Sequence, residues 1–112
     1  MATRQIEKNN WQPYFDRVSR ELTTTTVDIE VIGDDMGAQS ETHHTSLLGL
    51  SYDPKDDAFS IVSEAIEHRV SEPRQIFIDE DADELHSIEV IDGDGHRHIA
   101  KLRQALKLPQ KE

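Results

Sequence analysis

The chain has 112 residues, of which 35% are hydrophobic and 31% charged, so it has the size of one domain with a single core. It contains no cysteine, which excludes disulfide bonds, thiolate zinc sites and cysteine nucleophiles and is typical of a reducing compartment. The first ten residues are polar, and no window approaches the roughly 20 apolar residues of a membrane span. We therefore predict a cytoplasmic protein that has no membrane partner.

The formal net charge is -11, and the acidic residues are concentrated in the middle of the chain. Between residues 26 and 95 there are three basic and nineteen acidic side chains. Such a region repels polyanions, so we predict no nucleic-acid partner and expect a cationic protein partner instead. The expected contact strip is Asp79–Glu84, with five carboxylates in six residues, and its alternative is a solvated connection without a partner. The sequence does not predict the oligomeric state.

Residues Asn10–Leu22 carry the strongest helical pattern in the chain. The apolar side chains are spaced by three, four and seven residues and form one stripe: Trp11, Tyr14, Phe15, Val18 and Leu22. Pro13 falls in the first turn, where its missing N–H has no intrahelical partner. The β-branched run Thr23–Thr26 ends the helix.

The aromatic stripe of this helix predicts how it packs. Aromatic side chains at helical spacing belong to a core, so we expect them to cover the alternate residues of Val27–Val31. We place Trp11 near the rim of the core, because its indole N–H needs a hydrogen-bond partner. Residues 1–9 are expected to be a flexible N-terminus.

Alternating apolar and polar residues predict the strands that follow the helix. They are listed in chain order: Val27–Val31, Leu47–Tyr52, Ala58–Ser63, Arg74–Asp79, Leu85–Ile91 and Arg97–Leu102. A loop at Gly33–Ser40 and a tight turn at Asp53–Asp56 separate the first three strands. A short extended piece containing His68 and Val70 precedes the break at Pro73.

Two Asp-Gly pairs in Asp92–Gly95 predict a hairpin turn between the last two strands. A turn centred on Asp94–Gly95 pairs Asp92 with Arg97 and Val90 with Ile99. The alternative, a calcium loop, lacks the bidentate glutamate and the flanking helices of an EF-hand.

These elements predict one α+β domain at residues 10–103, with one N-terminal amphipathic helix packed on an antiparallel five- or six-stranded meander sheet or open roll. Residues 104–112 are expected to form a short helix or a tail, and the sequence does not decide between the two.

Several motifs along nearly the whole chain resemble a small uncharacterised family of bacterial proteins of about this length. Three motifs lie in the first half of the chain: Trp11-x-x-Tyr14-Phe15-Asp16-Arg17-x-Ser19-Arg20, Gly33-x-Asp35-x-Gly37-Ala38-Gln39 and Leu48-x-Leu50-x-Tyr52-Asp53-Pro54-Lys55-Asp56-Asp57. Two more follow: His68-x-Val70-x-x-Pro73 and Ile88-Glu89-Val90-x-Asp92-x-Asp94-Gly95. The resemblance implies one compact domain of the bacterial cytosol, and it carries no catalytic residue to this chain.

The histidines are the first candidates for chemistry. His96 and His98 lie two apart on a predicted strand, so they share a face and offer two metal ligands. The only candidates for further ligands are His86, Glu89, His43 and His44, and nothing in the sequence places them. We therefore predict no metal site, no cofactor and exposed histidines on a hairpin.

Three residues are predicted to bind a ligand: Gly37, Gln39 and His68. The two glycines of the loop at Gly33–Gln39 allow close backbone approach, and Gln39 offers both a donor and an acceptor. His68 would act as a base if a carboxylate oriented its ring, and the alternative is a structural histidine.

No catalytic residues are predicted, because acid, base, nucleophile and cofactor motifs are not assembled in the sequence. We predict a non-enzymatic binding or accessory module. The alternative function is a small hydrolase or metal-dependent enzyme built on His68 or on the pair His96 and His98.

Overall fold

The computed structural model describes residues 2–20, 25–33, 37–81 and 84–107, and it describes only the backbone of residues 2, 37–44, 81 and 103–107. The described residues form eight strands and one α-helix, which directly follows a 3-10 turn. In chain order the elements are β1 (Ala2–Ile6), η1 (Lys8–Asn10), α1 (Trp11–Arg20), β2 (Thr26–Gly33), β3 (Gly37–Asp53), β4 (Ala58–Ser63), β5 (Glu67–Ser71), β6 (Pro73–Asp81), β7 (Glu84–Asp92) and β8 (Arg97–Lys107).

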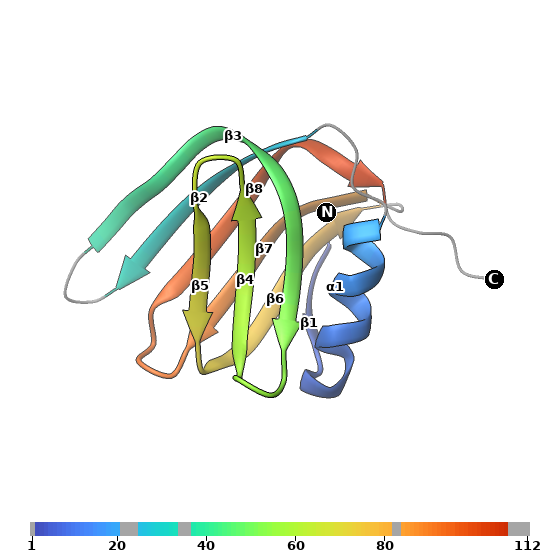
Figure 1. Cartoon of the computed structure of the whole chain (residues 1–112), viewed down its shortest axis with the longest axis vertical. Helices are drawn as coiled ribbons and strands as arrows, with labels where there is room; N and C mark the ends of the chain where they lie inside the picture. Colours follow the sequence, from blue (N-terminus) through green and yellow to red (C-terminus); the bar gives the residue numbers. More distant parts are fainter. Residues whose placement is uncertain (1, 21–24, 34–36, 82–83, 108–112) are drawn as a thin grey trace.

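The strands make one sheet that curls into two layers. Its order is β1-β6-β7-β8-β2-β3-β4-β5, and every neighbouring pair is antiparallel. The curl is possible because the 17-residue strand β3 takes part in both layers: its first part pairs with β2, and its last part, from Leu47, pairs with β4. The front layer is therefore β3-β4-β5, and the back layer is β2-β8-β7-β6-β1 (Figure 1).

The predicted α+β class is confirmed, but the sheet has eight strands where five or six were expected. The two additional strands are β1 and β5, which lie at the two ends of the sheet. Among the described side chains, each contributes one buried residue, Ile6 in β1 and Val70 in β5. One buried residue gives no alternating pattern, which is why residues 1–9 were expected to be flexible and β5 was expected only as a short extended piece.

Helix α1 packs on the second half of β3 and closes the gap between β3 and β1 (Figure 1). Its buried residues are those of the predicted stripe, except for Leu22, which lies outside the described residues. Phe15 meets Phe59 with ring centroids 4.8 Å apart, and Trp11 meets Tyr52 at 5.0 Å. The helix therefore does not lie over β2 as expected.

Trp11 lies in the core and not at its rim, since it is 1% exposed. Its indole N–H donates to the carbonyl oxygen of Ile6 at 2.8 Å, so the end of β1 supplies the hydrogen-bond partner that the indole needs. Pro13 is the third residue of α1, in the first turn as predicted.

The last strand is longer than the sequence predicted. β8 continues to Lys107, where it pairs with Glu84, so residues 104–107 form neither the expected helix nor a tail. Residues 108–112 lie outside the described part. Within the described residues, no helix is both long and apolar enough to cross a membrane.

Candidate functional site

The turn between β7 and β8 determines where the histidines lie. The amide of Gly95 donates to the carbonyl of Asp92, and the amide of Asp92 donates to the carbonyl of His96, each at 3.0 Å. These bonds close a three-residue loop whose last residue, Gly95, has a φ of +86°, a conformation that favours glycine. The predicted register was wrong by one residue, because Ile91 pairs with Arg97 and Val90 with His98.

This register turns His98 into the protein. His98 is 8% exposed, and it shares the inner face of β8 with Ala100 and Leu102. His96 precedes β8 and is partly exposed. The prediction that both are exposed hairpin histidines is therefore wrong for His98. The two rings do not share a strand face; they meet at one carboxylate.

That carboxylate is Asp92, and it begins a hydrogen-bonded array that crosses both layers. Its Oδ2 lies 2.9 Å from Nε2 of His98, and Nδ1 of His98 lies 2.9 Å from Nε2 of His68. An ionised carboxylate only accepts hydrogen bonds, so Nε2 of His98 is the donor. In the neutral His98 ring Nδ1 then accepts, and Nε2 of His68 donates to it. The array joins β7 and β8 of the back layer to β5 of the front layer.

The environment of Asp92 favours its ionised form. Burial raises the pKa of Asp92, but the hydrogen bond from His98 and the backbone N–H groups of His96 and Asp94 outweigh it, so the pKa lies below its usual value. Both N–H groups donate to Oδ1, at 3.0 and 2.9 Å. The side chain is therefore a fixed acceptor with both oxygens engaged.

The connection from β5 to β6 lies against this turn. Glu72 has a φ of +54°, and its amide donates to the carbonyl of Asp57 at 2.9 Å. A Cβ at Gly93 would come within 3.3 Å of Oε1 of Glu72, so the glycine allows the two connections to pack closely. The turns that end β3, β5 and β7 thus lie at one end of the sandwich, which we call the turn end (Figure 1).

Of the residues that were predicted to bind a ligand, only His68 has a described side chain, and the structure brings it to His98. Gly37 and Gln39 belong to β3 and not to a loop. In this strand their backbones pair with Gly33 and Val31 of β2. The side chain of Gln39 lies outside the described part.

Of the further ligands considered for the histidine pair, the two with described side chains, Glu89 and His86, lie elsewhere on β7. Glu89 forms an ion pair with Arg97 at 2.9 Å on the sheet surface. His86 sits at an irregularity in the pairing of β7 with β8, between Leu85 and Ser87. The side chains of His43 and His44 lie outside the described part. The sequence reasoning missed Asp92 as the partner of His98, although the signal was present as an aspartate and a histidine flanking one predicted hairpin turn.

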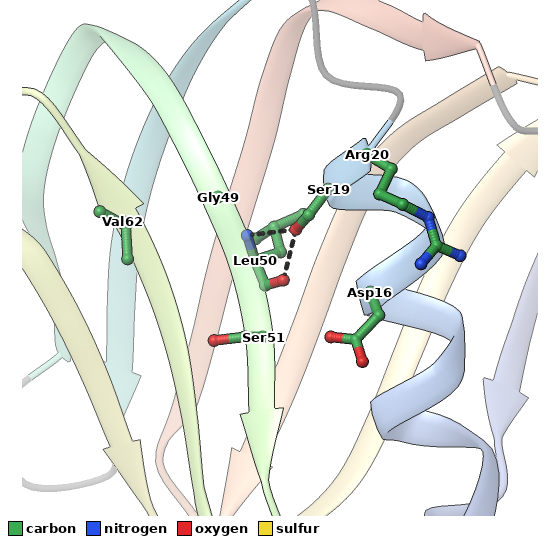
Figure 2. Close-up of a pocket in the computed structure, with 7 residues that line it drawn as sticks. All are labelled: Asp16, Ser19, Arg20, Gly49, Leu50, Ser51 and Val62. Carbon is green, nitrogen blue, oxygen red and sulfur yellow. Dashed lines mark hydrogen bonds between the residues drawn. The ribbon is translucent and has the colours of Figure 1, made fainter.

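A second feature is a shallow depression between α1 and β3, with a volume of about 340 Å³. Figure 2 shows the residues that line it: Asp16, Ser19, Arg20, Gly49, Leu50, Ser51 and Val62. The hydroxyl of Ser19 donates to the carbonyl of Leu50 at 2.6 Å and accepts from its amide at 2.9 Å. This hydroxyl satisfies the backbone of β3 at the floor of the depression, so we assign it a structural role.

Comparison with known proteins identifies the family. The sequence model of DUF5335, a family of unknown function, matches residues 2–111. The chain belongs to this family. An uncharacterized protein of Aquifex aeolicus (strain VF5) is 40% identical over 111 residues, which cover 98% of this chain and 100% of the relative. No solved structure matches. The predicted resemblance to a bacterial family of unknown function is confirmed, and membership in DUF5335 brings no assigned activity.

Proposed function

We propose that this domain is a non-enzymatic binding module of the bacterial cytosol that docks a cationic segment of a partner protein on the outer face of its back layer. The observation that carries the proposal is a group of part-exposed apolar side chains on this face. We call it the apolar face patch, and it consists of Ile32, Phe77, Ile91 and Ile99.

The register of the back layer makes these four residues neighbours. One cross-strand row runs Phe77, Glu89, Ile99, Glu30, and an adjacent row runs Ile91, Arg97, Ile32. Cross-strand and diagonal neighbours on one face of a sheet are within side-chain reach of each other. The front layer and α1 lie on the opposite side of this layer (Figure 1). Contiguous apolar surface with a polar rim is typical of interaction sites.

The charges around the apolar face patch favour a cationic partner. Carboxylates of Glu30 and Glu89 and the guanidinium of Arg97 interrupt it, and Arg97 forms an ion pair with Glu89. The chain as a whole has a formal net charge of -11, and association rates follow the sign of such a field. The partner we propose therefore presents lysine or arginine side chains around an apolar centre.

The strip Asp79–Glu84 was expected to be a contact strip or a solvated connection, and its described residues belong to the strands β6 and β7. β6 extends through Asp81, and the side chain of Glu80 is bound to Arg4 at 2.6 Å. Asp79 follows Phe77 by two residues, so it shares the outer face of β6 with the patch. We propose that this part of the strip contributes to the rim of the docking face.

The experiment compares Phe77→Asp and Ile99→Asp with the control Ser60→Asp, which adds the same charge to the outward side of β4 in the front layer. Proteins captured from the native host are purified and titrated against each variant. We expect the two face variants to lose at least tenfold in affinity, the control to bind as the wild type does, and binding to weaken as salt rises above about 0.15 M. A captured partner that binds all three variants equally contradicts the proposal, and so does a wild type that uses this face to self-associate in sedimentation.

The Asp92–His98–His68 array supports a second candidate, a small histidine-dependent hydrolase. A histidine that is oriented through a second ring by a carboxylate is an arrangement for general-base chemistry. The test is hydrolysis of p-nitrophenyl acetate by the wild type, by His68→Ala and by the control Phe77→Asp. A rate above that of free imidazole that is lost only in His68→Ala favours the enzyme, and equal rates in all three proteins exclude this role.

A further inference from the structure

We propose that the β7–β8 turn binds a divalent transition-metal ion such as Zn²⁺ or Mn²⁺, with Asp92, Asp94 and His96 as the protein ligands. The inference is independent of the docking face, because these side chains belong to the turn end and not to the apolar face patch. The spacing of the donor atoms, their chemistry and the way in which Asp92 is held all favour a bound ion.

The turn brings three possible ligand atoms together. One donor atom from each of the three side chains lies within 4.8 Å of the other two. The residues alternate with Gly93 and Gly95, so the loop closes tightly with no side chain between the ligands. Asp94 is exposed and His96 partly exposed, so an ion can reach them from solvent.

One distance is better suited to a shared ion than to a hydrogen bond. Nδ1 of His96 lies 3.7 Å from Oδ2 of Asp92, beyond the usual 2.7 to 3.2 Å of a nitrogen–oxygen hydrogen bond. Two ligand atoms that are each about 2.1 Å from one zinc ion at a tetrahedral angle lie about 3.4 Å apart. Binding therefore needs only a small adjustment of these two side chains.

The third ligand can come from Asp94 without rebuilding the turn. Its amide is already fixed by Oδ1 of Asp92 at 2.9 Å, while its carboxylate is in solvent. The donor set is then two carboxylates and one imidazole. An imidazole favours transition metals over Ca²⁺ and Mg²⁺, which take oxygen ligands. Three protein ligands leave positions that water fills, as in open metal sites.

The Asp92–His98–His68 array holds one ligand of this cluster, Asp92, from the interior of the protein. Oδ2 of Asp92 accepts the ring N–H of His98, which is 8% exposed and is bonded in turn to His68. Groups behind a metal ligand orient it, and their loss commonly weakens metal binding 10- to 100-fold. The carboxylate of Asp92 is thus held in place from the interior, and its remaining lone pair on Oδ2 is directed by that bond.

The test uses the full chain without an affinity tag and titrates it with Zn²⁺ by calorimetry. A parallel titration with Mn²⁺ records the paramagnetic broadening of backbone NMR signals. We expect one site whose affinity falls at least tenfold in His96→Ala and in Asp94→Asn, with broadening centred on residues 92–98. The control is Asp53→Asn in the β3–β4 turn, where Oδ1 of Asp53 accepts the amide of Lys55 at 2.9 Å much as Oδ1 of Asp92 accepts that of Asp94. We expect this control to bind as the wild type does.

Thermal unfolding of each variant shows whether it is folded, which we expect for substitutions at surface turn positions. Broadening centred on another part of the chain, such as His43 and His44, overturns the assignment. Equal affinity in His96→Ala and the wild type overturns it as well. The same conclusion follows if the wild type binds neither ion up to about 1 mM, the weak end of the affinity scale.

Discussion

Alkaline titration of the two tyrosines tests the packing of α1 against the sheet. Both are buried: Tyr14 on α1 is 8% exposed and Tyr52 on β3 is 5% exposed. Burial, with the negative charge of Glu80 adding to it, raises the pKa of Tyr14 to about 12. Burial, together with the hydrogen bond to Asp57, raises the pKa of Tyr52 to about 12.

The fold therefore favours the neutral phenols. The contribution of the buried neutral phenols to the free energy of unfolding is complete below the unfolded pKa of about 10. It is lost as the pH rises from about 10 to about 12. A difference of two pKa units corresponds to about 2 to 3 kcal/mol for each group. Two such losses are comparable to the whole stability of a small domain, about 5 to 15 kcal/mol, so we expect the protein to unfold in this pH range.

The assay follows tyrosinate absorbance at 295 nm together with far-ultraviolet circular dichroism as the pH is raised. The chain has only these two tyrosines, so no third phenol obscures the signal. We expect no absorbance change near pH 10, and then a rise that coincides with loss of the native spectrum. Tyr52→Phe should halve the amplitude. An absorbance midpoint near pH 10 in a protein that retains its native spectrum would refute the burial of the two tyrosines between α1 and the sheet.

Three further substitutions test other contacts. Phe15→Ala should lower the free energy of unfolding by about 3 to 5 kcal/mol, because a fully buried ring is replaced by a cavity; an unchanged urea midpoint would show that the helix does not dock. Ser19→Ala should cost about 1 to 3 kcal/mol, since it removes both hydrogen bonds to the backbone of Leu50; calorimetry measures the loss, and Ser19→Thr should restore part of it. Asp92→Asn should flatten the dependence of stability on pH below about pH 4, because the lowered pKa of Asp92 gives a contribution that is present above that pH and disappears as the carboxylate is protonated. Urea unfolding between pH 2 and 6 with Asp94→Asn as control measures this, and equal slopes in the two variants would count against it.

The sequence predicted elements whose burial alternates along the chain. β2 alternates buried and part-exposed residues from Thr26 to Gly33, and β4 has the bounds predicted for it. The helical stripe was also correct within the described residues. These elements were predictable because each buries one face against the core, and the periodicity of the apolar residues indicates which face is buried.

The sequence did not predict the register of the β7–β8 hairpin or the curvature of the sheet. The position of Gly95 in a three-residue loop shifts the hairpin by one residue, and that shift alone decides whether His98 points inward. The contact of His68 with His98 depends on the curl of the sheet through β3, which joins residues 30 apart. No local pattern around His68 or His98 indicates that the two residues are in contact. The array could therefore be identified only in the structure.

The indole N–H of Trp11, the only tryptophan of the chain, donates a hydrogen bond to the carbonyl of Ile6 in β1. The partner of this strand lies farther away along the sequence than that of any other described strand. β1 lies at an end of the sheet and pairs with residues seventy or more positions away, as in Ala2 with Glu80. Such an edge strand is stabilised late in folding and its amides exchange with solvent early. The fluorescence of Trp11 should therefore report detachment of β1 before the rest of the sheet opens, which makes it an intrinsic probe of partial unfolding at the end of the back layer.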